Sequence, residues 1–333
     1  MVKLAIDIMG GDYAPLEIIK GVQLALERYS DLEFTLFGDK KVISEHLPAG
    51  PRIKIVDCPE KMDMGEKDPI GEIRRNRNTS LVRAFQAVRD KEVDGVVTAG
   101  PTQGTVAAAH LIIRRIKGMK RVALCPELPA LGEKSRLLLD VGANTDLRSE
   151  HLLQIAQFAS IYAQEVKGIS KPLVGLMNIG SEPGKGRELE KETFNLLQND
   201  PHINFYGNLE GKDIFSTPCD ILLTDGYTGN MVMKTCEGVV KTVGTFFKEE
   251  INNTTRKIGY LFMKKVFKNF KKKMSPDEIG GANLFGVDGI VVKAHGSSNA
   301  YAFSNAINQA RLAVLGDVVA KMKTIISEGN DLE

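Results

Sequence analysis

Cys219-Asp-Ile-Leu-Leu-Thr-Asp-Gly-Tyr-Thr-Gly-Asn230 runs directly into a long helical pattern. Ile221–Leu223 form a short apolar run typical of a buried strand, and Asp225-Gly226 and Gly229-Asn230 are turn dipeptides. The stretch therefore predicts a strand, a tight turn and the start of a helix. Such a helix start can bind an anion through its free N–H groups, and the two glycines would let the backbone approach closely. The alternative is an ordinary strand-to-helix connection.

The same construction recurs along the whole chain. Strand-like and helix-like segments alternate, which predicts an α/β fold with a doubly wound, mostly parallel sheet in a three-layer αβα sandwich. No linker-like segment divides the chain, so we expect residues 1–333 to form a single α/β domain. Ligands of such sheets bind at the carboxyl ends of the strands. Polar glycine turns lie at those ends, after Ile8, Thr98, Val141, Ile179, Thr224 and Val292.

Composition excludes several classes of protein. A hydrophobic fraction of 43% and a charged fraction of 26% are those of an ordinary globular protein. The net charge of +2 argues against a nucleic-acid partner. Asp7 interrupts the first apolar run, and no run reaches the ~20 residues that span a bilayer. We expect a cytoplasmic protein with no metal site, because the cysteines are far apart: Cys58, Cys125, Cys219 and Cys236.

One segment, at about 250–275, departs from the alternation. Between Ile251 and Met274 there are eight Lys or Arg residues and no acid. Apolar residues at helical spacing and lysines on the other side predict a protruding basic amphipathic helix. Such a helix can bind an anionic membrane or an acidic partner, or it can pack on the core or on another subunit. The apolar residues are Phe262, Met263, Val266, Phe267 and Phe270, and the lysines include Lys264, Lys265 and Lys268.

A few polar residues beside the strand-end turns could carry chemistry. Lys185 is flanked by two glycines, which suits either a solvated loop lysine or an ammonium placed over an anion. Ser297 and Ser298 are good N-cap residues, and with His295 they would also suit a phosphate. Asn144 and Asn230 are neutral donors of the kind that hold a carbonyl oxygen or an oxyanion.

The motifs of several enzyme classes are missing from the sequence. The chain has no dinucleotide fingerprint after its first strand, no P-loop and no Gly-x-Ser-x-Gly elbow. Asp140 and Asp146 follow a strand, where Asp is more often a turn residue than a metal ligand. The inventory favours anion binding and electrostatic catalysis over a metal, a nicotinamide cofactor or a covalent serine.

Four motifs in this order resemble the bacterial phosphate acyltransferases of phospholipid synthesis (the PlsX family). The similarity extends from Leu4 to about Arg311. The motifs are Ala5-Ile-Asp-Ile-Met-Gly-Gly-Asp-Tyr-Ala-Pro15, Leu139-Asp-Val-Gly-Ala-Asn144, Thr224-Asp-Gly-Tyr-Thr-Gly-Asn230 and Lys293-Ala-His-Gly-Ser-Ser298.

The resemblance implies a reaction and a set of partners. Acyl-[acyl carrier protein] and inorganic phosphate would give acyl phosphate and free carrier protein, without a cofactor. The acyl phosphate would pass to a membrane glycerol-3-phosphate acyltransferase. The resemblance further implies a homodimer, a fold similar to phosphotransacetylase and the isopropylmalate-type dehydrogenases, and peripheral association with the inner face of the membrane. Contacts to membrane or carrier would come from Phe262, Lys264, Lys265, Phe267 and Lys268.

The resemblance also assigns site residues. Lys185 and Asn230 match the Gly-Lys-Gly and Thr-Gly-Asn positions of the family and become catalytic candidates, as does Asp225 for proton handling. Where the family usually has an asparagine, this chain has Pro101, which puts a direct role of the Gly100–Gly104 loop in doubt. Candidate substrate and phosphate contacts are Gly11, Asn144, Thr228, Gly229, His295, Gly296, Ser297 and Ser298.

Two alternatives to this function remain at the level of sequence. One is a short-chain acyl-CoA phosphotransferase on the same scaffold. The other is a non-catalytic protein that binds acyl carrier protein or a lipid surface. The sequence leaves open the preferred acyl length, the position of the acyl chain and the proton donor to the leaving thiol.

Overall fold

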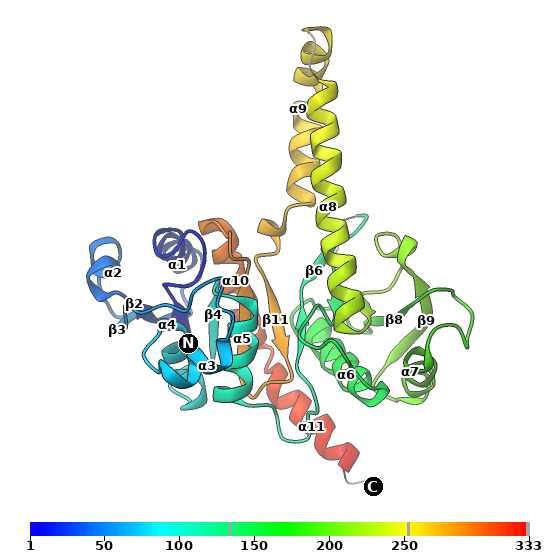
Figure 1. Ribbon diagram of the computed structural model, residues 1–333, viewed down its shortest axis with the longest axis horizontal. Helices are drawn as coiled ribbons and strands as arrows, with labels where there is room; N and C mark the ends of the chain where they lie inside the picture. The colour runs from blue at the N-terminus through cyan, green and yellow to red at the C-terminus, as the bar shows by residue number, and fades with distance from the viewer. Residues whose placement is uncertain (133–134, 252–253, 331–333) are drawn as a thin grey trace.

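The strands form two sheets that lie side by side in the computed structural model, which describes residues 1–132, 135–251 and 254–330 (Figure 1). In the larger sheet only β11 runs against its neighbours. Its seven strands, in spatial order, are β3 (Ile53–Asp57), β2 (Leu32–Gly38), β1 (Val2–Asp7), β4 (Gly95–Thr98), β12 (Ile290–Ala294), β11 (Gly281–Phe285) and β5 (Ala123–Cys125).

The smaller sheet is parallel apart from its edge strand β6. The predicted α/β class with mostly parallel strands is thus confirmed, and the strands divide into two sheets. That residues 1–333 form a single domain stays a prediction. The five strands, in spatial order, are β6 (Glu127–Pro129), β7 (Ser135–Leu139), β10 (Ile221–Leu223), β8 (Leu173–Asn178) and β9 (Asn204–Glu210).

Helices cover both faces of the larger sheet because its strands are apolar on both sides. Leu4, Ile6 and Val292 face one apolar cluster, which includes α1 (Leu16–Arg28) and α10 (Ala300–Leu315). Ala5 and Val291 face the other, which includes α4 (Ser80–Arg89) and the π-helical turn Ala109–Ile113. The shorter helices around this sheet are α2 (Lys40–His46), α3 (Pro69–Arg75) and α5 (Thr102–Ala108).

The two sheets share one hydrophobic core. Helix α6 (Ser149–Glu165) packs on β7 and β10 of the smaller sheet and also on β11 and α10 of the larger one. Its Phe158 stacks on Phe285 of β11, with ring centroids 4.7 Å apart. The remaining helices are α7 (Glu188–Asn199), α11 (Val318–Asn330) and the 3-10 turns Gly211–Asp213 and Pro276–Glu278.

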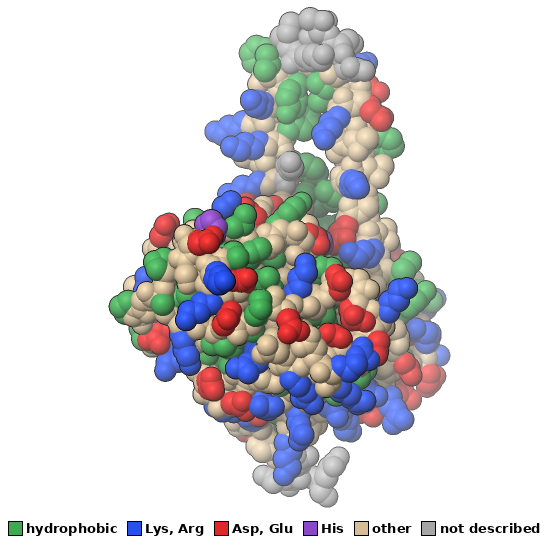
Figure 2. All heavy atoms as spheres, turned by 60° about the vertical axis from the view of Figure 1, so that its left-hand side comes forward, with side chains coloured by type: hydrophobic (Ala, Val, Ile, Leu, Met, Phe, Trp, Pro, Cys, Tyr) green, Lys and Arg blue, Asp and Glu red, His purple; other side chains and the backbone are tan. Residues whose placement is uncertain are grey.

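Helices α8 (Gly226–Glu250) and α9 (Thr254–Lys273) form a hairpin that projects far from the body of the molecule (Figure 1). The basic segment predicted at about 250–275 coincides with α9, which is one arm of this pair. Apolar side chains are exposed along the hairpin beside Lys and Arg (Figure 2), and Phe262 is 85% exposed. Across the described residues, we find no helix with the length and apolar content that crossing a membrane requires.

Phe267 differs from the other predicted surface contacts of α9. Its ring packs edge-on against Phe247 of α8 at 5.2 Å and against Tyr260 at 5.4 Å. Phe267 thus holds the two arms of the hairpin together, while Phe262, Lys264, Lys265 and Lys268 are exposed. Sequence spacing could not separate these roles because the partner ring comes from α8.

The turn between β10 and α8 is packed tightly against the turn that follows β7. Asp225 caps α8 by accepting a hydrogen bond from the Thr228 N–H at 2.7 Å. A Cβ on Gly226 would clash with the Asn144 carbonyl, and one on Gly229 would clash with the Asp140 carbonyl. The space that these glycines leave is therefore filled by backbone, and it is not open to an anion as the sequence suggested.

We predict that Gly226→Ala lowers the free energy of unfolding by about 1–3 kcal/mol, because the added methyl meets fixed backbone. Gly238→Ala on the same helix is the matched control, since a Cβ there meets nothing within 4 Å. It should stabilise the protein by up to about 1 kcal/mol through helix propensity. Urea unfolding of both variants measures the effects, and equal stabilities would refute this packing account.

Candidate active site

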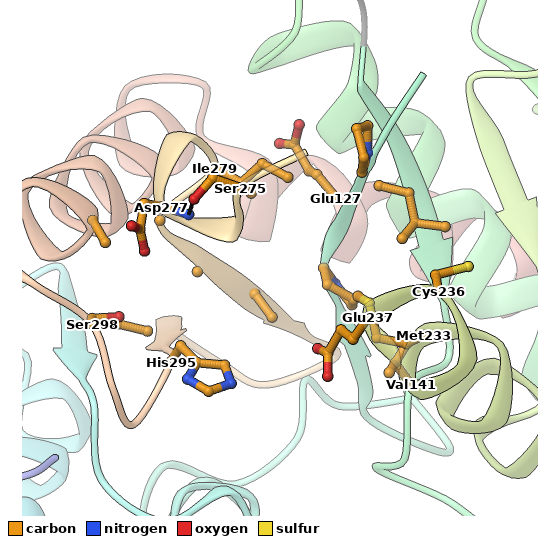
Figure 3. Close-up of a pocket in the computed structure, with 18 of the residues that line it drawn as sticks. Glu127, Val141, Met233, Cys236, Glu237, Ser275, Asp277, Ile279, His295 and Ser298 are labelled. Carbon is orange, nitrogen blue, oxygen red and sulfur yellow. Dashed lines mark hydrogen bonds between the residues drawn. The ribbon is translucent and has the colours of Figure 1, made fainter. Parts of the chain in front are cut away.

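A cleft of about 560 Å³ lies between the two sheets. One wall comes from the first turns of α8, and the opposite wall comes from β11, β12 and the start of α10. Figure 3 shows His295 and Ser298 on one side, facing Met233, Cys236 and Glu237 of α8 on the other. Clefts of this size with a few convergent polar groups are typical substrate sites.

The polar part of the cleft gathers residues from two of the four sequence motifs. Asn230, Lys293, His295, Ser297 and Ser298 all line it. The ring Nδ1 of His295 accepts the Ser297 N–H at 3.2 Å and lies 2.8 Å from the Ser297 hydroxyl. The neutral ring therefore carries its proton on Nε2, which leaves this nitrogen as a donor. This is a suitable set of groups for a phosphate or a developing oxyanion.

Asn230 stands in the first turns of α8 beside the turn that follows β7. A Cβ on Gly142 would lie 3.6 Å from the Asn230 side chain. Among the described residues, the Asn230 amide has no hydrogen-bond partner. Its donors are thus free for a ligand in the cleft, as its assignment as a catalytic candidate requires.

The rest of the cleft wall is mainly apolar. It also includes Glu127, Lys234, Glu237, Lys241, Ser275 and Asp277. The apolar side chains come from both sheets and from the base of the hairpin. These residues are Leu124, Pro126, Leu128, Pro129, Val141, Phe215, Met233, Val240, Met274 and Ile279.

Asn144 does not line the cleft, although the sequence predicted it as a substrate contact. Its side-chain N–H groups donate to the Val122 carbonyl at 2.5 Å and to the Asp140 carboxyl at 2.9 Å. Asp140 also accepts the N–H of Leu124 at 2.8 Å and of Asn144 at 2.8 Å, and burial raises the pKa of this carboxyl. Both residues therefore brace the turn rather than offer donors to a substrate.

Asp225 is buried beside the cleft, and both of its oxygens are in use. One accepts the Thr228 N–H, and the other pairs with the Arg187 guanidinium. Burial acts to raise the pKa of Asp225, but the hydrogen bonds from Thr228 and Arg187 outweigh it and lower this pKa. A carboxylate held ionised in this way positions the helix start and is a weak proton acceptor near neutral pH. Thr228 likewise serves the cap through its N–H.

Lys185 lies on the exposed loop after β8 and is not among the residues that line the cleft. Its carbonyl accepts a hydrogen bond from the Asn178 side chain at 3.0 Å. Arg187, two residues on, reaches Asp225 at the start of α8. The loop thus contacts the helix that carries Asn230, and the catalytic role of Lys185 stays a prediction.

The predicted contacts Gly11 and Gly296 lie together beyond the carboxyl ends of β1 and β12. The Asp12 N–H donates to the Gly296 carbonyl at 2.8 Å, and Gly11 has a φ of +113° that favours glycine. A Cβ on Gly11 would also come within 3.2 Å of the Gly296 carbonyl. These glycines join the first motif to the last, and neither lines the cleft.

The loop with Pro101 does reach the cleft. Pro101 precedes α5, a position that suits proline because no helical N–H is needed there. The next residue, Thr102, lines the cleft. The proline therefore removes an asparagine side chain without removing the loop from the site.

Sequence reasoning missed two residues of the site. Lys293 belongs to the fourth motif but not to the predicted site, and Arg187 belongs to neither. The signal for Lys293 was a cation in the otherwise apolar run Ile290–Ala294. No local signal pointed to Arg187, because its partner Asp225 is far away in the sequence.

The chain is similar to a known family and to several known proteins. The model of a family described as "Fatty acid synthesis protein" matches residues 2–321. A phosphate acyltransferase of Acholeplasma laidlawii (strain PG-8A) is 49% identical over 330 residues, covering 98% of both chains. Another, of Staphylococcus aureus (strain MRSA252), is 46% identical over 332 residues, covering 99% of this chain and 100% of the relative. A solved phosphotransacetylase from Streptococcus pyogenes has a TM-score of 0.61 at 16% identity, covering 96% of this chain and 94% of that chain.

The likeness to the phosphotransacetylase confirms the predicted α/β fold. The family match and the two relatives decide the class of chemistry, which is acyl transfer with phosphate. The chain belongs to the phosphate acyltransferase family, as its four motifs predicted, and it is an enzyme of that kind. The alternative of a non-catalytic binding protein is therefore excluded.

We predict that Asp225→Ala lowers the free energy of unfolding at pH 7 by about 1–2 kcal/mol, mainly through the lost helix cap. Arg187 is 61% exposed, so water screens the ion pair and limits its share. Because the folded pKa of Asp225 is lowered, its contribution is present above the ordinary value of 3.8 and is lost as pH falls through the folded pKa.

Urea unfolding at pH 7, 5 and 3 measures this difference. Asp225→Asn is the matched control, since its amide oxygen can still cap the helix, and it should lose less stability than the alanine variant. If the wild type exceeds Asp225→Ala in free energy of unfolding by as much at pH 3 as at pH 7, Asp225 is not the ionised cap described here.

Proposed function

We propose that the enzyme transfers a long-chain acyl group from acyl carrier protein to inorganic phosphate, which makes acyl phosphate for phospholipid synthesis. The observation that carries the proposal is the cleft itself. Donors suited to phosphate line it together with a wall of mainly apolar side chains. A short acyl group would leave most of that wall exposed to water, whereas a long chain would cover it.

In the proposed reaction phosphate is itself the nucleophile. An oxygen of hydrogen phosphate bonds to the thioester carbonyl carbon, the C–S bond breaks, and its electron pair leaves on sulfur. The proton of hydrogen phosphate ends on the released thiol. Asn230 and the Nε2–H of His295 are suitably placed in the cleft to stabilise the oxyanion that develops on the carbonyl oxygen.

The carrier would deliver its acyl group from the side of the hairpin. The cleft lining follows α8 from Asn230 to Lys241, so the apolar wall opens toward the base of α8 and α9. Exposed lysines of α9 offer a basic surface there for an acidic partner. The homodimer and the transfer of product to a membrane glycerol-3-phosphate acyltransferase stay predictions.

The second candidate function is short-chain transfer between coenzyme A and phosphate. The likeness of the fold to a phosphotransacetylase favours it. The mainly apolar lining of the cleft argues for the long-chain substrate instead.

We predict phosphate-dependent release of carrier thiol from palmitoyl-[acyl carrier protein], with recovery of palmitoyl phosphate, and at least 100-fold less turnover with acetyl-CoA. Thiol release and mass spectrometry of the product measure both reactions. The reverse preference would replace the proposal with the short-chain alternative.

Two variants give this assay its internal controls. Asn230→Ala should lower kcat/KM about 100-fold, the usual loss for an oxyanion donor. Lys185→Ala should also lower turnover if its loop closes over phosphate. Unchanged turnover in Lys185→Ala would withdraw that residue from the catalytic set while leaving the substrate assignment intact.

For the hairpin we predict binding to vesicles that contain anionic phosphatidylglycerol, with Phe262→Glu weakening it about tenfold or more. The change removes an exposed apolar side chain and adds a repelled charge. Sedimentation with vesicles measures the affinity. Leu315→Glu, an exposed apolar residue off the hairpin, is the matched control. Equal binding by both variants would leave carrier docking or subunit packing as the role of the hairpin.

A further inference from the structure

Lys293 is a buried cation at the polar end of the cleft. It lies near the carboxyl end of the central strand β12, paired with Thr98 of β4 on one side and Ala282 of β11 on the other. Only 8% of the residue is exposed, and the part that is accessible lines the cleft. A lysine in such a position is rare because its ammonium loses most of its water.

No carboxylate is paired with this charge. Across the described residues, Lys293 forms no salt bridge, and its Nζ donates to the adjacent Ala294 carbonyl at 2.6 Å. Burial lowers the pKa of Lys293 to about 8, Asp12 acts in the opposite direction, and Lys234 adds to the lowering. A buried ammonium with no counter-ion costs free energy, so the fold retains it against its own stability.

A second unpartnered group lies in the same cleft. Ser298 is only 3% exposed, and its hydroxyl has no hydrogen-bond partner among the described residues. It lies two residues before α10, a helix of 16 residues whose N-cap Asn299 bonds back to the Ala302 N–H at 2.9 Å. The positive end of this helix therefore adds to the charge of Lys293. A buried cation and a buried free hydroxyl together call for an anion with several acceptor oxygens.

We propose that Lys293 is the phosphate-binding cation of this enzyme and that it holds the incoming phosphate together with the Ser298 hydroxyl. This assignment rests on the proposed function for its catalytic meaning, but phosphate binding can be measured without turnover. The ammonium and the hydroxyl each bind phosphate oxygens, which leaves another oxygen to attack the thioester. Lys293 lies inside the cleft, whose lining does not include Lys185.

The position of Lys293 also sets a pH dependence. Asp12 and Lys234 act on its pKa. The other titratable groups that line the cleft are Glu127, Cys236, Glu237, Lys241, Asp277 and His295. Because its folded pKa lies below the ordinary value of 10.5, the free enzyme loses this cation as pH rises through about 8. Phosphate affinity should therefore weaken between pH 7.5 and pH 9.5.

The test compares Lys293→Met with the wild type. Methionine keeps the unbranched apolar stem and removes the charge, so the variant should fold at least as stably. Titration of the free enzyme with inorganic phosphate should show a Kd about 10- to 100-fold higher, the usual range for a lost bond to a charged group. The KM for the acyl carrier substrate should change less than twofold. Lys212 is exposed in the 3-10 turn Gly211–Asp213, so Lys212→Met is the control and should bind phosphate normally.

Several outcomes would overturn the proposal. Unchanged phosphate affinity in a folded Lys293→Met is one, and an equal loss of affinity for the acyl substrate is another. If Lys293→Met does not fold, the wild type decides, because a phosphate affinity that is flat from pH 7.5 to pH 9.5 contradicts the assignment. Ser298→Ala should raise the Kd for phosphate about fivefold. If the wild type binds phosphate but releases no carrier thiol, and Lys293→Met loses the phosphate binding, the phosphate site stands and the proposed function is refuted.

Discussion

The arrangement of the cleft depends on the buried carboxyl of Asp140, which links the two sheets. It follows β7 of the smaller sheet and accepts the N–H of Leu124, in β5 of the larger one. The start of α8 packs on the Asp140 backbone through Gly229, and on the Asp140 carboxyl and the Asn144 carbonyl through Gly226. Moving one sheet relative to the other would break a buried hydrogen bond and open a packed contact. Asp140 therefore fixes the distance between the two cleft walls, although it does not line the cleft.

This link between the sheets suits a reaction that needs positioned groups more than reactive ones. A thioester is already activated and phosphate is already a nucleophile, so the protein has to hold both and to stabilise charge. Rigid elements would supply the proposed donors: Asn230 from the first turns of a capped helix, and Lys293 from an interior strand of a sheet. Lys185 lies on an exposed glycine-flanked loop, outside this lining.

Local patterns predicted the strand–turn–helix units and the basic helix, because both depend on near neighbours in sequence. The division into two sheets was not predicted, since it depends on short strands such as β6 and on where the chain crosses at Pro126. The roles of Gly226 and Phe267 depend on Asn144 and Phe247, which no local pattern indicates. Lys293 had a local signal, a cation in the apolar run Ile290–Ala294. A lysine at a strand end is usually exposed, however, and only the folded structure shows that this one is buried.

Helix α8 connects the two surfaces to which the proposed function assigns work. Its first turns carry Asn230 into the cleft, and its far end carries Phe246 and Phe247 at the hairpin. A helix of 25 residues is about 37 Å long, so the hairpin extends well beyond the reach of the cleft. Because one continuous helix links the cleft to the hairpin, a membrane or carrier bound at the hairpin would set the direction from which the acyl chain arrives. An acyl phosphate released along the apolar wall would then emerge beside the hairpin, with little exposure to the water that hydrolyses it.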